Sequence, residues 1–138
     1  MYEGFGTENR EWLFLQESES TNNDIKKRIY ESAEPVFAVI SAKKQTGGRG
    51  RLGRSFFSPD GGLYFSVSFP LSGKEKSISF MTLLAGLCVS EAIMELTGVK
   101  TKIKWPNDIY YNDKKLGGIL CELVSGVCPT AIVGIGIN

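Results

Sequence analysis

The sequence contains no histidine, and this absence excludes several kinds of catalytic site. Serine and cysteine hydrolases use an imidazole as general base, and many zinc sites use it as a ligand. Any catalysis must therefore depend on lysine, arginine, carboxylates or a hard cation such as Mg²⁺. The three cysteines (Cys88, Cys121, Cys128) form no CxxC pair, and we expect them to be buried, reduced thiols.

Long apolar runs are also missing, and a bilayer-spanning helix needs about 20 residues. We therefore expect no membrane association. The first residues, MYEGFGTENREW, are polar and acidic and resemble neither a signal peptide nor a transit peptide. The sequence predicts a cytoplasmic protein whose 138 residues form one domain with one modest core.

Acidic residues are absent from residues 35–59, which include the stretch KKQTGGRGRLGR at residues 43–54. This segment holds five cations and no acid, a charge of +5, whereas the rest of the chain has 11 cations against 15 acids, or −4. Its four glycines free backbone N–H groups to converge on an anion. The pattern indicates one site for an anionic ligand rather than a surface that coats nucleic acid.

The glycines of GRGRLG at residues 48–53 also match the G-x-G-x-x-G pattern of dinucleotide-binding proteins. That motif requires a helix directly afterwards, and here a Pro-Asp-Gly-Gly turn and a strand follow. A protein kinase carries a similar loop between strands but needs a histidine-containing catalytic motif. A solvated, RGG-like nucleic-acid tether stays as the alternative.

Hydrophobic patterning predicts an α+β domain in which the basic loop joins two strands. We expect helices at residues 21–33 and 77–96, the second largely buried and ended by Gly98. We expect strands at residues 11–16, 36–42, 63–70, 101–105, 109–111, 115–123 and 131–138. Leu63, Phe65, Val67 and Phe69 alternate with polar residues, which is typical of a half-buried strand, and Asn112-Asp113 predicts a hairpin turn.

Several other segments bring polar or glycine residues to the ends of these elements. Ser20 or Thr21, with Asp24, predicts a capping box, although the hydroxyls could instead meet a polar ligand. Asn107 and Asp108 stand at a strand-to-strand corner, either as turn formers or as ligands. Glycine pairs at 117–118 and at 134 and 136 indicate close approach of a ligand or of another backbone. We expect these segments and the basic loop to form the walls of a narrow anion pocket.

The ordered set STN, QTGGRGRLGR, KWPNDI, KLGGILCE and VGIGIN resembles the catalytic domain of biotin–protein ligases, from about residue 12 to residue 138. Lipoate ligases share that fold but lack the Arg-Gly-Arg-x-Gly-Arg pattern. The resemblance implies one catalytic domain over residues 1–138 with an α+β, class II aminoacyl-tRNA-synthetase-like fold. Its mixed or antiparallel central sheet would carry helices packed on one face.

The resemblance also sets expectations about the two ends of the domain. Family members that double as repressors carry an N-terminal helix-turn-helix domain, and this domain has no counterpart here, so we expect no DNA binding. The C-terminal part and SH3-like domain of the family also have no counterpart. A sheet edge left open in this way would favour a homodimer.

The activity that the resemblance implies is ATP-dependent and has two steps. The carboxylate of biotin attacks the α-phosphorus of ATP, giving biotinyl-5′-AMP, and a lysine of a biotin carboxyl carrier protein then takes the acyl group. Two anions brought to about 4 Å repel by roughly 4 kcal/mol at an effective dielectric of 20, so fixed cations are required. The alternative is a truncated, non-catalytic fragment that binds biotin or its adenylate.

Residue roles follow by match to the family motifs. The resemblance implies that Lys115 and Arg51 are catalytic. It assigns biotin to Ser20, Thr21, Asn22, Gln45, Arg49, Gly50, Arg51, Lys115 and Gly118. It assigns ATP to Arg49, Arg51, Arg54, Asn107, Asp108, Lys115 and Asn138, with Asp108 as a ligand of Mg²⁺. The strand glycines would leave room for the ligand, and the loop at residues 46–55 should be mobile until the ligand binds.

Overall fold

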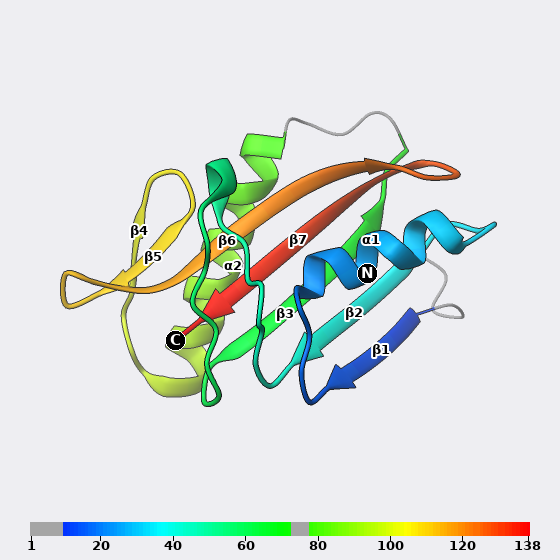
Figure 1. Cartoon of the computed structure of the whole chain (residues 1–138). Coiled ribbons are helices and arrows are strands. Elements are labelled where there is room, and N and C mark those ends of the chain that lie inside the picture. The colour runs from blue at the N-terminus through cyan, green and yellow to red at the C-terminus, as the bar shows by residue number, and fades with distance from the viewer. Residues whose placement is uncertain (1–9, 73–77) are drawn as a thin grey trace.

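The computed structural model describes residues 10–72 and 78–138. Within these residues, seven strands form one sheet in the order β1-β2-β3-β7-β6-β5-β4 (Figure 1). They are β1 (Arg10–Leu15), β2 (Phe37–Ala42), β3 (Leu63–Pro70), β4 (Lys102–Lys104), β5 (Asp108–Tyr111), β6 (Lys114–Ser125) and β7 (Pro129–Ile137). β1 and β2 run parallel, and all other neighbours in the sheet are antiparallel. The predicted α+β class with a mixed sheet is confirmed.

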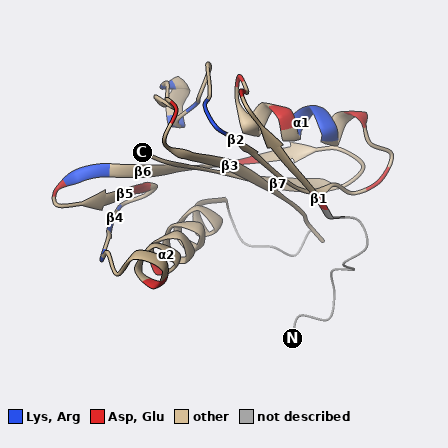
Figure 2. Cartoon of the chain, turned by 90° about the horizontal axis from the view of Figure 1, so that it is seen from below, with Lys and Arg blue, Asp and Glu red and all other residues tan. Residues whose placement is uncertain are grey.

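The α-helices of the described part of the chain, α1 (Thr21–Glu31) and α2 (Ile78–Thr97), lie on opposite faces of this sheet (Figure 2). Ile25 and Ile29 of α1 pack with Ile132 of β7. The next β7 residue, Val133, belongs instead to the cluster against which the helix residues Met81, Ala85, Val89 and Ile93 pack. Because successive strand residues point to opposite faces, one strand serves both cores. The expectation that the helices share one face is therefore wrong.

Helix α2 is less buried than its sequence suggests. Only Thr82 and Gly86 of its residues are buried, whereas Leu84 and Met94 are about half exposed (49% and 50%). A helix that packs on one sheet face buries one stripe, so the expectation of a largely buried helix is wrong. By length and composition, α2 is also long and apolar enough to span a membrane, so the statement that the sequence lacks a long apolar run is wrong. Core helices of soluble proteins have the same length and composition. The expected first residue of this helix, Ser77, lies outside the described residues.

The last strand lies in the middle of the sheet. β7 pairs with β3 along one side and with β6 along the other, and the edges of the sheet are β1 and β4. The idea that the final strand leaves a broken sheet edge is therefore wrong, and a homodimer stays a prediction without that support.

Local turn chemistry agrees with the sequence. Asn112 and Asp113 both have positive φ (47° and 59°), as a two-residue hairpin turn between β5 and β6 requires. Gly98 ends α2 with a φ of 71°, and its N–H donates to the carbonyl of Met94. The three cysteines are free, as expected, but the expectation that they are buried is wrong, because Cys88 is exposed and Cys121 and Cys128 are only partly buried.

Candidate active site

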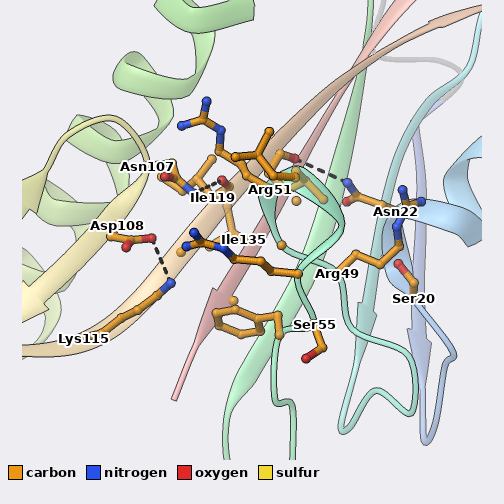
Figure 3. Close-up of a pocket in the computed structure, with 18 of the residues that line it drawn as sticks. Ser20, Asn22, Arg49, Arg51, Ser55, Asn107, Asp108, Lys115, Ile119 and Ile135 are labelled. Carbon is orange, nitrogen blue, oxygen red and sulfur yellow. Dashed lines mark hydrogen bonds and ion pairs between the residues drawn. The ribbon is translucent and has the colours of Figure 1, made fainter.

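A pocket of about 370 Å³ lies on the α1 face of the sheet, between the start of α1, the basic loop and strands β5, β6 and β7 (Figure 3). Most of the predicted site residues line it: Ser20, Thr21, Asn22, Gln45, Arg49, Gly50, Arg51, Arg54, Asn107, Asp108, Lys115 and Gly118. Asn138 lies instead beside a neighbouring hollow that shares Ser55, Phe56 and Lys115 with the pocket. The structure thus brings distant motifs together, while the role of each residue stays a prediction.

The N-terminus of α1 is not closed by a capping box. Ser20 is the N-cap residue, yet its side chain makes no capping hydrogen bond. The carboxylate of Asp24 accepts from the Ser18 hydroxyl at 2.5 Å instead of turning back to the helix start. The backbone N–H of Thr21 donates to the side-chain oxygen of Gln45 at 2.9 Å, so the basic loop supplies the cap. The Ser20 hydroxyl consequently lines the pocket instead of closing the helix.

Asn22 is a buried polar residue of the pocket, with 4% of its surface exposed. Its amide nitrogen donates to a carboxylate oxygen of Glu122 (2.9 Å) and to the carbonyl of Leu120 (3.4 Å). Its amide oxygen accepts from the hydroxyl of Ser66 at 2.5 Å. Ser66 also lies 2.7 Å from the Thr21 hydroxyl, which continues the network to Gln45.

Sequence reasoning missed Ser66 on β3 and Glu122 on β6, and for Ser66 the packing of β3 explains why. We expected the apolar side of this strand to face the core, but its polar side, with Tyr64, Ser66 and Ser68, is fully buried against α1. Leu63, on the other side, is half exposed. The serines are tolerated there because each makes hydrogen bonds to elements that are distant in sequence. In the sequence, the only available signal was the alternating polar side of this strand, which lies beside a predicted ligand site.

The basic loop divides its five cations between its base and the pocket. Lys43 pairs with Asp60 (2.9 Å) and Lys44 with Glu17 (2.5 Å), both near the surface. The hydrogen bond from Lys44 to Glu17 raises the lysine pKa. The three arginines line the pocket. Two of them, Arg51 and Arg54, form no ion pair among residues 10–72 and 78–138.

Arg49 differs from those two arginines because it reaches α1 and β6. Its guanidinium donates to the side-chain oxygen of Asn23 at 3.0 Å and lies 3.7 Å from Glu122. Figure 3 shows Arg49 beside Asn22 and Ser20, across the pocket from Lys115. One arginine is therefore already held by protein groups, whereas its two neighbours are available to an anion.

The opposite wall contains the predicted catalytic lysine. The ammonium group of Lys115 lies 2.9 Å from Asp108, across the β5–β6 pair (Figure 3), and 5.7 Å from the centre of the Phe56 ring. Asp108 is the only carboxylate that lines the pocket, and the described residues contain no group of three metal-ligating side chains. The part of the chain that the structure describes therefore offers no dedicated metal cage.

The strand glycines accommodate protein side chains in this structure. A Cβ on Gly134 would lie 2.2 Å from the amide oxygen of Asn22, and one on Gly136 would lie 2.4 Å from the Phe56 ring. Our expectation was that these glycines leave room for ligand. Their direct role is to let Asn22 and Phe56 approach the sheet closely.

Asn138 holds the end of β7 against the loop. Its side-chain oxygen accepts from the Tyr64 hydroxyl at 2.7 Å, and its amide nitrogen donates to the carbonyl of Phe57 at 3.1 Å. These contacts give it a structural role beside its predicted contact with ATP.

Positive charge surrounds the mouth of the pocket. Residues 100–115 contain five lysines and two acids, a charge of +3, in addition to the +5 of residues 35–59. The remaining residues hold six cations against thirteen acids, so the chain is strongly polarised. Figure 2 shows basic residues on the loop above the sheet and at the start of β6. Such a distribution attracts a polyanion to the pocket.

Comparison with known proteins agrees with this geometry. Residues 14–138 match the Biotin/lipoate A/B protein ligase family. The chain belongs to this family. Among solved members, the Aquifex aeolicus biotin protein ligase in complex with biotin and ATP superposes with a TM-score of 0.77 at 41% identity. That match covers 93% of this chain and 52% of the other.

Two curated members of the ligase family are similar over most of this chain. The "Bifunctional ligase/repressor BirA" of Escherichia coli is 37% identical over 87% of this chain, and the match covers 38% of that protein. The "Biotin--[acetyl-CoA-carboxylase] ligase" of Mycobacterium tuberculosis is 31% identical over 98% of this chain and 52% of its own. The chain thus spans about half, or less, of the length of these relatives, and the expected resemblance to biotin–protein ligases is confirmed.

Proposed function

We propose that this chain activates biotin with ATP and transfers it to a lysine of a biotin carboxyl carrier protein. The observation that carries the proposal is the convergence of Arg51, Arg54 and Lys115 on one pocket whose other end is a polar, hydrogen-bonded wall. Biotin has the matching shape: a neutral ureido ring at one end and a carboxylate at the other. The Aquifex relative was solved with both biotin and ATP.

The cations explain how two anions can react. One carboxylate oxygen attacks the α-phosphorus, the bond to the β-phosphate oxygen breaks, and pyrophosphate leaves with its electron pair. Arg51 and Arg54 are suited to grip phosphate oxygens because a guanidinium presents two parallel N–H donors. Lys115 would leave Asp108 and neutralise the charge shared by the carboxylate and the phosphate. In the second step the amine of the acceptor lysine attacks the acyl carbon, AMP leaves, and the amine releases its proton.

The wall formed by α1 suits the ureido ring. Gln45 has a second amide hydrogen beyond the one given to Ser58, and Asn22 has a second lone pair beyond the one that accepts from Ser66. Together with the Ser20 hydroxyl, these groups present both donors and acceptors, as a urea requires.

We propose that Mg²⁺ binds to this site only together with ATP. A magnesium ion usually binds through one or two carboxylates plus substrate phosphates. Asp108, with the side-chain oxygen of Asn107 beside it, fits that pattern once Lys115 is drawn to the ligand. The ion would neutralise phosphate charge.

Incubation with biotin, ATP, Mg²⁺ and a biotin carboxyl carrier domain, followed by avidin blotting, tests the proposal. Labelled carrier is the expected result, and lipoate in place of biotin should give no pyrophosphate release. Pyrophosphate release is measured alongside. Biotin binding without pyrophosphate release would instead support the non-catalytic fragment. A cytoplasmic location and the absence of DNA binding stay predictions.

A further inference from the structure

Glu122 lies just behind the pocket, on β6, and does not line it. Its side chain is 19% exposed. One carboxylate oxygen accepts from Lys26 at 2.7 Å and the other from the Asn22 amide at 2.9 Å. Arg49 lies 3.7 Å away. Burial acts to raise the pKa of this carboxyl, but the hydrogen bonds from Lys26 and Asn22 outweigh it and hold the pKa below its usual value. Glu122 is therefore ionised and accepts at both oxygens at neutral pH.

An acceptor-only neighbour fixes the orientation of the Asn22 amide. Because a carboxylate has no proton to give, the NH₂ group of Asn22 must face Glu122 and its oxygen must face Ser66. Ser66 then donates its one proton to Asn22 and can only accept from Thr21, whose single hydroxyl proton is then not available to Gln45. The direction of hydrogen bonding is thus set from Glu122 through Asn22 and Ser66 to Thr21.

This direction decides which groups the wall offers to a ligand. If the Asn22 amide were reversed, its NH₂ group would replace a carbonyl oxygen on the Ser66 side, and Ser66 would turn its own proton to Thr21. A urea ring needs acceptors for its N–H groups and donors for its carbonyl oxygen, so reversal exchanges the two.

We propose that Glu122 is a positioning residue that sets the donor and acceptor pattern of the biotin-binding wall through Asn22. The inference rests on the proposed function, because biotin is the ligand whose ureido ring reads the pattern. Glu122 touches neither substrate nor reacting atoms, so it acts on recognition rather than on the chemical step.

Glu122→Gln tests this inference because it preserves shape but replaces one acceptor oxygen with a donor. The new NH₂ group must face either Lys26 or the amide of Asn22. We expect KM for biotin to rise at least about tenfold, while KM for ATP changes by less than about threefold and kcat is nearly unchanged. Lys26→Met is the matched control, since it removes the other partner of Glu122 and leaves Asn22 in contact. Its KM for biotin should stay within about twofold of the parent value.

A merely structural Glu122 would give a different result. Loss of thermal stability in Glu122→Gln with unchanged KM for biotin, or an equal rise in Lys26→Met, would overturn the inference. The double variant with Asn22→Ala adds a further test: if Glu122 acts through Asn22, the double variant should be no worse than Asn22→Ala alone. Additive losses would overturn it.

Calorimetric binding of biotin separates this inference from the proposed function. If the parent chain binds biotin but releases no pyrophosphate, catalysis fails while the Glu122 effect is still measured as a drop in affinity. If the parent chain releases pyrophosphate and Glu122→Gln matches it at every biotin concentration, the inference alone fails. If the parent binds no biotin, both are wrong.

Discussion

Gly134→Ala should destabilise the chain and weaken biotin binding, because the new methyl group collides with a side chain that has nowhere to go. The Cβ would lie 2.2 Å from the amide oxygen of Asn22 and 2.9 Å from its Cγ. Overpacking of this kind costs about 1–3 kcal/mol. If Asn22 moves aside, it loses hydrogen bonds to Glu122 and Ser66, which contribute about 0.5–1.5 kcal/mol each. The combined loss of about 2–6 kcal/mol is a large part of the about 5–15 kcal/mol that stabilises a typical domain.

Urea denaturation followed by circular dichroism measures this loss, and Gly118→Ala is the matched control. Its Cβ would meet the Phe56 ring at 3.4 Å, an ordinary contact, so its free energy of unfolding should change by less than about 1 kcal/mol. Gly134→Ala should also bind biotin more weakly than the parent. Equal stability of the two variants would refute the placement of Asn22 against Gly134.

Three further predictions concern the loop, pH and salt. Arg51 and Arg54 lack ion pairs within the described residues, and the Leu52 side chain is 89% exposed, so trypsin should cut the free loop quickly. Biotin with ATP should slow this cleavage at least about tenfold, and an unchanged rate would contradict loop closure. Since the pKa of Glu122 is lowered in the fold, its stabilising effect is complete above the usual value of 4.5 and is lost as pH falls through the lower folded value. The gap in unfolding free energy between parent and Glu122→Gln should shrink below about pH 4, and a constant gap down to about pH 3 would argue otherwise. Raising salt from about 0.05 to 0.5 M should raise KM for ATP more than KM for biotin, because screening weakens attraction between cations and phosphates, and equal effects would count against charge steering.

The pocket could be predicted from the sequence because the signals that mark its residues are local. Arg51 sits in a glycine-rich stretch without acids, and Lys115 precedes two glycines in a strand. Spacing and composition are enough to place such residues at the ends of strands. The hairpin turn and the end of α2 were predictable for the same reason, since turn and cap residues depend on backbone geometry.

The errors arose where long-range contacts decide the outcome. Ser66 looked solvent-facing because serine is usually exposed, but hydrogen bonds with Asn22 and Thr21, 44 and 45 residues away, make its burial favourable. Asp24 was expected to cap α1, but Ser18 takes its carboxylate and Gln45 takes the helix N–H. The faces on which α1 and α2 pack depend on strand order, which no single segment encodes.

Pyrophosphate release by Lys115→Ala, with biotin and ATP but no carrier, tests the central claim most directly. At about 4 Å, one cation contributes up to roughly 4 kcal/mol of charge neutralisation. Its loss should lower the rate of pyrophosphate release at least about a hundredfold, in a chain that stays folded. The exposed neighbour Lys114→Ala is the control and should keep the parent rate. A folded Lys115→Ala variant that releases pyrophosphate at the parent rate would contradict the account.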